Sequence, residues 1–238
     1  MKHTLTEKEQ ADLRKKLTDW NTARPLIRSF LTTAGKANRT FEHTYPFYRF
    51  FNTGLIVTFY MVLSEDSHDV EILNIDDRLL KQWNVTLEDI KQAAADGDAR
   101  RGYSVAKLAD LIEELEGEAT KAAYCSVPLP QEYVIVTKPD VSVSYAAAGL
   151  VTAGVRKQLK QLFPQGCYIF PASVHDIIIL AKTEVDAEFA ELLHDNVTRS
   201  IYSHDSSKYN PDSDFLTEVI LQYNPWNDTF SIAGYDIE

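Results

Sequence analysis

The longest apolar stretch of the chain runs from Gly54 to Leu63 and constrains the fold more than any other feature. It has about half of the ~20 residues that a membrane-spanning helix requires, and the polar residues 64–66 end it. The wider stretch from Phe41 to Leu63 is dense in Phe and Tyr with β-branched residues toward its end, and Asn52-Thr53-Gly54 punctuates it. The stretch therefore predicts a strand buried in a protein core, with no membrane anchor.

The composition is that of a soluble globular protein. Of the 238 residues, 45% are hydrophobic and 25% are charged, which excludes disordered, collagen-like and coiled-coil classes. The polar residues 1–10 lack the apolar region of a secretory signal. Cys125 and Cys167 form no Cys-x-x-Cys pair, so neither a disulfide framework nor a zinc ribbon is indicated. We expect a cytoplasmic protein.

The first third of the chain reads as helices followed by a strand pair. Apolar residues at helical spacing predict two helices between Thr6 and Thr33, interrupted near Pro25. Residues 70–75 are the expected partner of the buried strand. The region is therefore expected to be helical at its start and to form a small sheet in the residues that follow.

Capping signals predict two further helices. Thr86 and Asp89 form a capping box, and we expect Asp96-Gly97-Asp98 to stop the helix that this box opens. Ser104 is expected to cap the next helix, which ends near Gly117. The exposed face of this second helix is acidic.

The second half alternates strands and helices. The expected elements are a strand over 133–137, a helix over 150–162, strands over 167–170 and 177–180, a helix over 186–202 and a hairpin of 215–223 with 229–235. The predicted class is α+β, a mixed or antiparallel sheet flanked by helices with a helical N-terminal part. Pro128 and Pro130 suggest a boundary between a helix-rich subdomain, 1–125, and an α+β subdomain, 126–238. One continuous domain is the alternative.

The residues that could carry chemistry gather between two predicted strands, in Phe170-Pro171-Ala172-Ser173-Val174-His175-Asp176. A hydroxyl, an imidazole and a carboxylate are the groups of a hydrolase relay. On an extended strand, however, Ser173 and His175 face one side and Asp176 faces the other. A structural role for the hydroxyl and the imidazole is the alternative to a hydrolase site at Ser173, His175 and Asp176.

Other catalytic signatures are absent from the sequence. Neither a phosphate-binding Gly-x-x-x-x-Gly-Lys loop nor a dinucleotide-binding Gly-x-Gly-x-x-Gly loop occurs. His-Asp occurs at residues 175, 194 and 204, but without the helical ligand pattern of metal-dependent phosphohydrolases. The aromatic residues between 41 and 51, beside Arg39 and Arg49, suit a core better than a nucleic-acid platform. We therefore expect no cofactor and no metal.

Charge is distributed unevenly. Residues 1–49 hold ten basic and five acidic residues, whereas residues 50–238 hold 14 basic and 30 acidic ones. This balance argues against direct contact with nucleic acid or an anionic membrane. Residues 184–238 are the most acidic segment, with 12 acidic and two basic residues. Acidic side chains at the start of this segment could instead contact a basic or nucleic-acid-associated protein; they are Glu184, Asp186, Glu188, Glu191 and Asp195.

Three blocks of sequence, residues 74–90, 133–137 and 168–178, resemble a bacterial family of unknown function met in Gram-positive gut bacteria. The most specific block is a Pro-x-Ser-x-His-acid motif, whose typical sequence in relatives is Pro-Ser-Ser-x-His-Glu. Here Ala172 and Asp176 replace the first Ser and the Glu. The resemblance implies a bacterial, intracellular protein and names no reaction.

These observations favour a cytosolic protein that acts by binding another protein through its acidic surface. An inhibitor or regulator of a nucleic-acid-processing partner, encoded on or against mobile elements, is the specialised form of this hypothesis. A hydrolase that uses Ser173 and His175 is the alternative.

Overall fold

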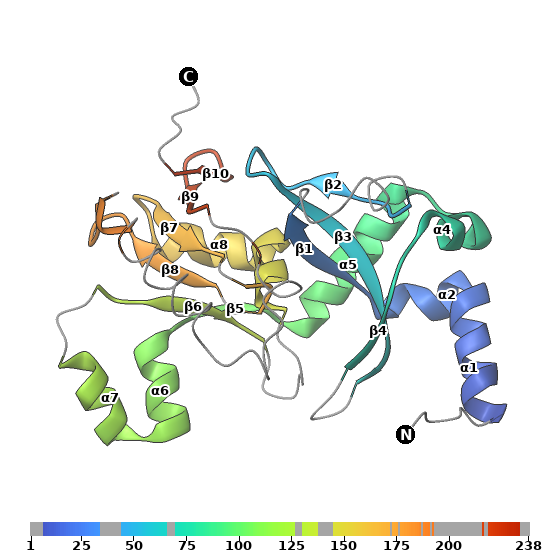
Figure 1. The fold of residues 1–238 in the computed structure, drawn as a ribbon, viewed down its shortest axis with the longest axis horizontal. Coiled ribbons are helices and arrows are strands. Elements are labelled where there is room, and N and C mark those ends of the chain that lie inside the picture. Colours follow the sequence, from blue (N-terminus) through green and yellow to red (C-terminus); the bar gives the residue numbers. More distant parts are fainter. Residues whose placement is uncertain are drawn as a thin grey trace.

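The computed structural model describes residues 7–33, 44–65, 70–126, 130–137, 145–171, 173–175, 177–186, 188–190, 192, 216 and 219–233. Two antiparallel sheets lie side by side along the long axis of the molecule, and helices lie at both ends and between the sheets (Figure 1). This arrangement confirms the predicted α+β class.

The first sheet is built around the predicted apolar strand. Its strands run in the order β1 (Ile27–Thr33), β3 (Leu55–Glu65), β2 (Tyr48–Arg49), and β4 (Val70–Asn74) also pairs with β3. Every residue of β3 from Leu55 to Val62 is buried, because partner strands and helices cover it. The predicted pairing of residues 70–75 with this strand is confirmed.

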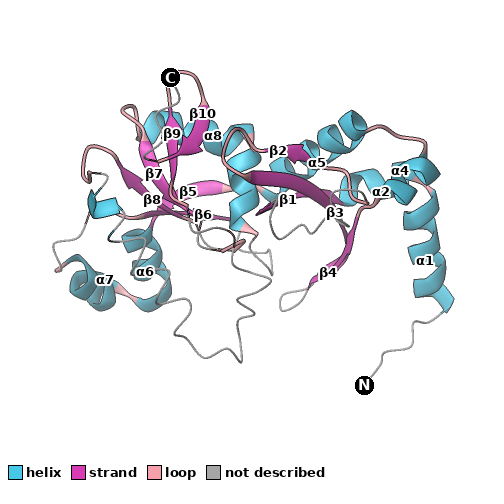
Figure 2. Ribbon diagram, turned by 45° about the horizontal axis from the view of Figure 1, so that its top comes forward, coloured by secondary structure: helices cyan, strands magenta, loops and turns pink. Residues whose placement is uncertain are grey.

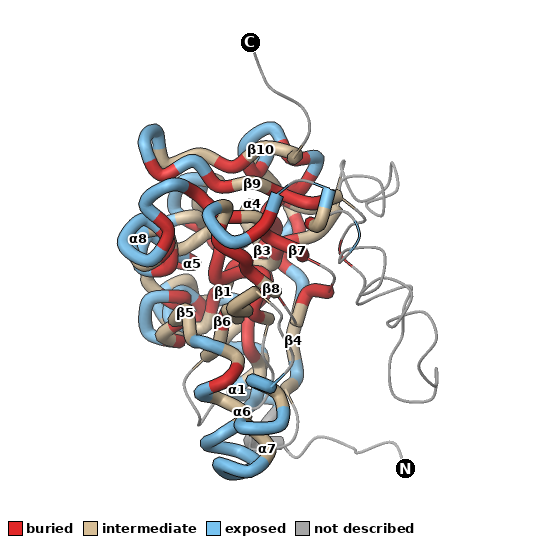
Figure 3. The backbone as a smooth tube through the Cα atoms, turned by 90° about the vertical axis from the view of Figure 1, so that its left-hand side faces the viewer, coloured by how far each residue is buried: buried red, intermediate tan, exposed pale blue. Residues whose placement is uncertain are grey.

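The second sheet has six strands in the order β10 (Thr229–Ile232), β9 (Leu221–Asn224), β7 (Cys167–Phe170), β8 (Ile178–Ala181), β6 (Tyr133–Val136), β5 (Ser104–Lys107). The predicted terminal hairpin is present as β9 and β10, which pair antiparallel. The strand predicted over 133–137 is confirmed as well. Buried residues, red in Figure 3, concentrate along the strands of both sheets.

Helices cover the sheets and the ends of the molecule (Figure 2). The α-helices are α1 (Glu7–Thr18), α2 (Trp20–Ala23), α4 (Asp77–Trp83), α5 (Leu87–Arg101), α6 (Leu108–Glu116), α7 (Glu118–Cys125) and α8 (Ala153–Leu162), with 3₁₀ helices at Arg24–Leu26 and Ala146–Val151. Among the described residues, no helix has the length and apolar character needed to cross a membrane.

One predicted helix is a strand. Residues 27–33 form β1 instead of continuing the N-terminal helices, and they pair with β3 along their whole length. The apolar residues here fit both periods, but alternation buries Ile27, Ser29 and Leu31 on one face, as a strand requires. Tertiary pairing with the buried strand favours the strand over the helix for these residues.

The predicted stop at residues 96–98 is also wrong. Helix α5 continues through these residues to Arg101 and ends at Gly102, which has a φ of 76°. Gly97 allows close packing, because a Cβ there would clash with the carbonyl oxygen of Ile27. The glycine therefore lets α5 approach the backbone of β1 within the distance that any side chain would forbid.

Ser104 does not cap a helix, since Ser104–Lys107 is the edge strand β5. The following helix begins only at Leu108 and ends at Gly117, as predicted. Strand β5 pairs with β6, so the second sheet takes an edge strand from before the boundary predicted at residue 125. The two-subdomain division stays a prediction.

Candidate ligand-binding site

The close approach of α5 to β1 buries a carboxylic acid. Asp98 follows Gly97 on α5 and is 1% exposed. Its Oδ2 and Oδ1 lie 3.2 and 3.4 Å from the backbone nitrogen of Ser29, which donates to them. A helix residue thus satisfies a backbone donor of the neighbouring strand, and its carboxyl group loses its water in doing so.

Burial raises the pKa of Asp98 to about 7, because the charged form is poorly solvated. Hydrogen bonds from Ser29 and the positive charges of Arg28 and Arg101 act in the opposite direction and only limit the rise. The carboxyl group therefore gains and loses its proton close to neutral pH. Perturbed groups of this kind gather at functional sites more than elsewhere.

Asp98 lines a cavity of about 460 Å³, here called the α5–α8 cavity. Residues of β1, β2, α5 and the start of α8 form its wall: Ser29, Tyr48, Lys91, Ala95, Asp98, Ala99, Gly102, Tyr103, Val151, Thr152, Ala153, Gly154 and Arg156. The volume is in the range of small-molecule sites. Asp98 is the single carboxylic acid among the described lining residues.

Two cations, Lys91 and Arg156, also line the cavity. The Lys91 ammonium lies 5.0 Å from the centre of the Tyr48 ring and 2.8 Å from Glu88 Oε1. The Arg156 guanidinium donates from Nη1 to the Val151 carbonyl at 2.7 Å and from Nε to Asp228 at 3.2 Å. Glu88 and Asp228 do not line the cavity, so the lining itself carries an excess of positive charge.

The N-terminus of α8 adds to this positive character. Thr152 caps the helix by accepting from the Val155 nitrogen at 3.3 Å, and Thr152, Ala153 and Gly154 all line the cavity. The first backbone N–H groups of a helix have no intrahelical acceptor, and the helix dipole favours negative charge beside them. A Cβ added at Gly154 would meet nothing within 4 Å, which shows that the space next to this turn is open.

Aromatic side chains supply the apolar part of the wall. Burial and the nearby Asp98 raise the pKa of Tyr48 to about 12, so its phenol stays neutral at physiological pH. Tyr103 is buried, and its hydroxyl has no hydrogen-bond partner among the described residues. The cavity thus combines neutral rings with two cations and an acid that titrates near pH 7.

The predicted hydrolase residues lie elsewhere. Ser173 is fully buried, and its Oγ accepts a hydrogen bond from the His175 nitrogen at 3.0 Å. The His175 ring is stacked on Tyr145 with 5.2 Å between ring centres. Asp176 lies outside the described residues. The described contacts give Ser173 the local role of closing a turn, and the relay of Ser173, His175 and Asp176 stays a prediction.

The predicted acidic binding residues are described only in part. Glu184, Asp186 and Glu188 are exposed, whereas Glu191 and Asp195 lie outside the described side chains. Two of the three exposed carboxylates also have structural partners. Glu184 Oε2 accepts from the Gln131 nitrogen at 2.8 Å, and Asp186 Oδ1 accepts from the Phe189 nitrogen at 2.8 Å. Among the described residues, no group of three or more His, Cys, Asp or Glu side chains is placed to hold a metal ion.

Sequence reasoning missed Asp98, Lys91 and Arg156 as a site. Asp98 stands in Asp96-Gly97-Asp98, which has the composition of a turn, and its burial depends on the contact of Gly97 with β1. Lys91 and Arg156 are far apart in the sequence and line one cavity only because α5 and α8 both border it. The signal available in the sequence was a glycine followed by an acid within a continuous amphipathic helix, which could have indicated a buried acid at a close helix contact.

A family model matches residues 2–205 of the chain, and its description is a family of unknown function, DUF5688. The residues that line the α5–α8 cavity all lie within the matched range. No curated protein and no solved structure matches the chain.

Proposed function

The chain belongs to the family of unknown function DUF5688, and from this premise we propose that it binds a small anion with an aromatic or apolar body in the α5–α8 cavity. The proposal is carried by one observation. A buried acid that is neutral for half of its population near pH 7 lines the same cavity as two cations and a helix N-terminus.

The anionic group is expected to lie beside Arg156 and the first turn of α8. A guanidinium and helix N–H groups both stabilise a carboxylate, sulfonate or phosphate by hydrogen bonds to the charged form. The body of the ligand would contact the rings of Tyr48 and Tyr103. Asp98 in its neutral form can donate a hydrogen bond to the anion, whereas its charged form repels the same ligand.

The test uses benzenesulfonate, an aromatic anion whose charge does not change between pH 5 and 9, with benzyl alcohol as its neutral counterpart. Isothermal titration is expected to show saturable binding of the sulfonate only. Arg156→Gln and Lys91→Gln should each weaken it at least about tenfold, the loss expected for one charged hydrogen bond. Lys157→Gln is the matched control, because Lys157 is exposed on α8 and does not line the cavity.

The pH dependence gives an independent readout. Binding of benzenesulfonate should strengthen as the pH falls from 8 to 6, because Asp98 takes up its proton in this interval. Asp98→Asn should bind with little dependence on pH. Binding that is undiminished in both cation variants, or absent up to 10 mM in a folded protein, would contradict the proposal.

A second candidate is binding of a basic protein through the acidic surface at Glu184, Asp186 and Glu188. The observation that favours it is their exposure in the most acidic segment of the chain. A bacterial, cytosolic regulator of a nucleic-acid-processing partner linked to mobile elements is the specific form of this candidate.

Charge reversal of Glu184, Asp186, Glu188 and Glu191 to Lys is expected to abolish capture of a basic partner at low salt. Glu184 and Asp186 also bind backbone nitrogens, so circular dichroism has to show that the variant is folded. A Glu188→Lys single variant removes no described backbone contact and serves as the milder test. Capture that is unchanged by all reversals would remove this candidate.

A further inference from the structure

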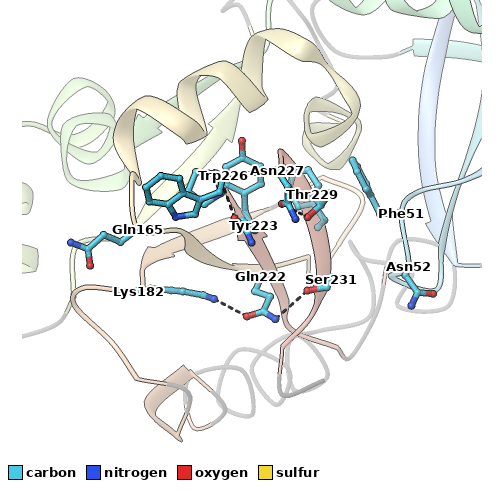
Figure 4. Close-up of a pocket in the computed structure, with 13 residues that line it drawn as sticks. Phe51, Asn52, Gln165, Lys182, Gln222, Tyr223, Trp226, Asn227, Thr229 and Ser231 are labelled. Carbon is cyan, nitrogen blue, oxygen red and sulfur yellow. Dashed lines mark hydrogen bonds between the residues drawn. The ribbon is translucent and has the colours of Figure 1, made fainter. Parts of the chain in front are cut away.

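The β9–β10 hairpin forms the wall of a second pocket, with a volume of about 570 Å³ (Figure 4). We call it the hairpin pocket, and its described lining is Phe51, Asn52, Gln165, Lys182, Gln222, Tyr223, Asn224, Pro225, Trp226, Asn227, Thr229, Phe230 and Ser231. It shares no described residue with the α5–α8 cavity. The two are separate spaces with different chemistry.

The rim of the hairpin pocket carries an exposed indole. Trp226 is 87% exposed, whereas Trp83 is buried and Trp20 packs against it with 5.7 Å between ring centres. The turn that carries Trp226 is held by its own hydrogen bonds, from the Trp226 nitrogen to Asn224 Oδ1 at 2.9 Å and from Thr229 Oγ1 to Asn227 Oδ1 at 2.6 Å. A large apolar ring that the core does not use is thus presented to solvent by an ordered turn.

The floor of the pocket is a fixed row of polar groups. Lys182 Nζ donates to Gln222 Oε1 at 2.7 Å, and Gln222 Nε2 donates to Ser231 Oγ at 3.1 Å, as the dashed lines in Figure 4 show. The same ammonium lies 5.2 Å from the centre of the Tyr168 ring. These contacts orient the Gln222 carboxamide and occupy the one cation of the described lining.

The far wall is equally fixed. Phe51 adopts a left-handed backbone conformation with φ 51°, which is unfavourable for a residue other than glycine. Its ring packs against Phe230 and Phe50, at 5.3 and 5.0 Å between ring centres. Asn52 forms a β-bridge with Ser231, which joins this loop to the hairpin.

The chemistry of the lining selects a class of ligand. Five carboxamide side chains line the pocket, those of Asn52, Gln165, Gln222, Asn224 and Asn227, and the described lining contains no carboxylate. Carboxamides both donate and accept, as the adjacent hydroxyl groups of a sugar ring require. The C–H face of a pyranose is apolar and fits against an indole, whereas a charged ligand would find only Lys182, which already has partners. We propose that the hairpin pocket binds a neutral saccharide, with one ring against Trp226.

The test is saturation-transfer NMR of the full chain with three neutral probes, maltotriose, cellotriose and chitotriose, together with AMP and the peptide Gly-Gly-Phe. At least one trisaccharide is expected to receive saturation and to shift Trp fluorescence with a saturable, millimolar or tighter response. Trp226→Ala should reduce this binding at least tenfold and Trp226→Phe should restore part of it. Leu115→Ala is the matched control, because Leu115 is also highly exposed, at 82%, and lies on α6.

Each outcome decides the proposal. Trisaccharide binding that is lost in Trp226→Ala and kept in Leu115→Ala supports it, provided that the variants unfold at the same temperature as the wild type. Binding of AMP or the peptide without any trisaccharide overturns the neutral-saccharide assignment. No saturable binding at 20 mM, or trisaccharide binding that Trp226→Ala leaves unchanged, also overturns it.

Discussion

The α5–α8 cavity and the hairpin pocket obtain their polarity in opposite ways. The first buries an acid against the backbone of β1 and has two cations in its lining, so that its charge depends on pH. The second is lined mainly by neutral polar groups, with Lys182 as the one cation of its described lining, and keeps its Trp226 ring in water. The first lies inside the residues matched by the family model, and most of the second lies after them. Burial of an acid makes the charge of a cavity depend on pH. In an exposed pocket with mainly neutral polar groups, recognition depends on shape and hydrogen bonding.

The largest expected difference between the two sites is the effect of Asp98 on the pH dependence of the free energy of unfolding. The folded protein keeps the Asp98 proton until about pH 7, whereas the unfolded chain releases it near 3.8. Stability that is present at low pH is therefore lost as the pH rises through 7. Between pH 5 and pH 8 we expect wild type to lose roughly 3 kcal/mol relative to Asp98→Asn, from 1.36 kcal/mol per pKa unit.

Urea unfolding of both proteins at pH 5, 6, 7 and 8 measures this difference in the free energy of unfolding. The contributions of the titratable groups that both proteins share cancel when the two values are subtracted. Asp89→Asn is a useful contrast, because hydrogen bonds with Thr86 lower the pKa of Asp89 instead of raising it. A constant difference between wild type and Asp98→Asn over this range would show that the carboxyl group does not titrate there.

The next effect tests the contact that creates the cavity. Gly97→Ala places a Cβ against the Ile27 carbonyl and should lower the free energy of unfolding by about 2 kcal/mol, since overpacking outweighs the better helix propensity of alanine. Gly154→Ala is the matched control, because its Cβ meets open space and should leave stability within about 1 kcal/mol of wild type. Equal stability of the two variants would refute the close approach of α5 to β1.

A smaller effect is expected where the two sites are joined. Asp228 accepts from the Tyr223 hydroxyl at 2.8 Å and from Arg156 at 3.2 Å, so it connects the hairpin with a residue of the α5–α8 cavity. Asp228→Asn should lower stability by about 1 kcal/mol, because it weakens two hydrogen bonds that involve a charge. Thermal unfolding measures the loss, and Tyr223→Phe should account for part of it. A variant as stable as wild type would mean that the Asp228 contacts add nothing to the strand pairing and aromatic packing of the hairpin.

The smallest effect is expected at the rim of the hairpin pocket. Trp226→Ala should change the free energy of unfolding by less than about 0.5 kcal/mol, because the indole is 87% exposed. Trp83→Ala should cost about 3 kcal/mol, since that indole is buried in the core. Chemical denaturation of both variants compares them directly. A large loss at Trp226 would mean that its ring stabilises the fold instead of serving a ligand.

The elements that the sequence predicts well are those whose pattern fits only one period. The buried strand at Gly54–Leu63 and the capping box at Thr86 are both present. The pattern of Leu26, Ile27, Phe30 and Leu31 fits both a helix and a strand. Pairing with β3, which is not visible in the sequence, determines that residues 27–33 form a strand. The candidate site was not predictable, because the burial of Asp98 results from a helix–strand contact and not from any local motif.

Gly97 also limits how the family can diverge. A helix that touches a strand's carbonyl leaves no room for a substitution at the contact, so relatives that keep this crossing have to keep a glycine there. The neighbouring Asp98 has no such steric obligation and can be replaced by another side chain that accepts from the Ser29 nitrogen. In an alignment of family members, an invariant glycine beside a variable acid would show that the family shares the helix–strand crossing but not the buried titratable group.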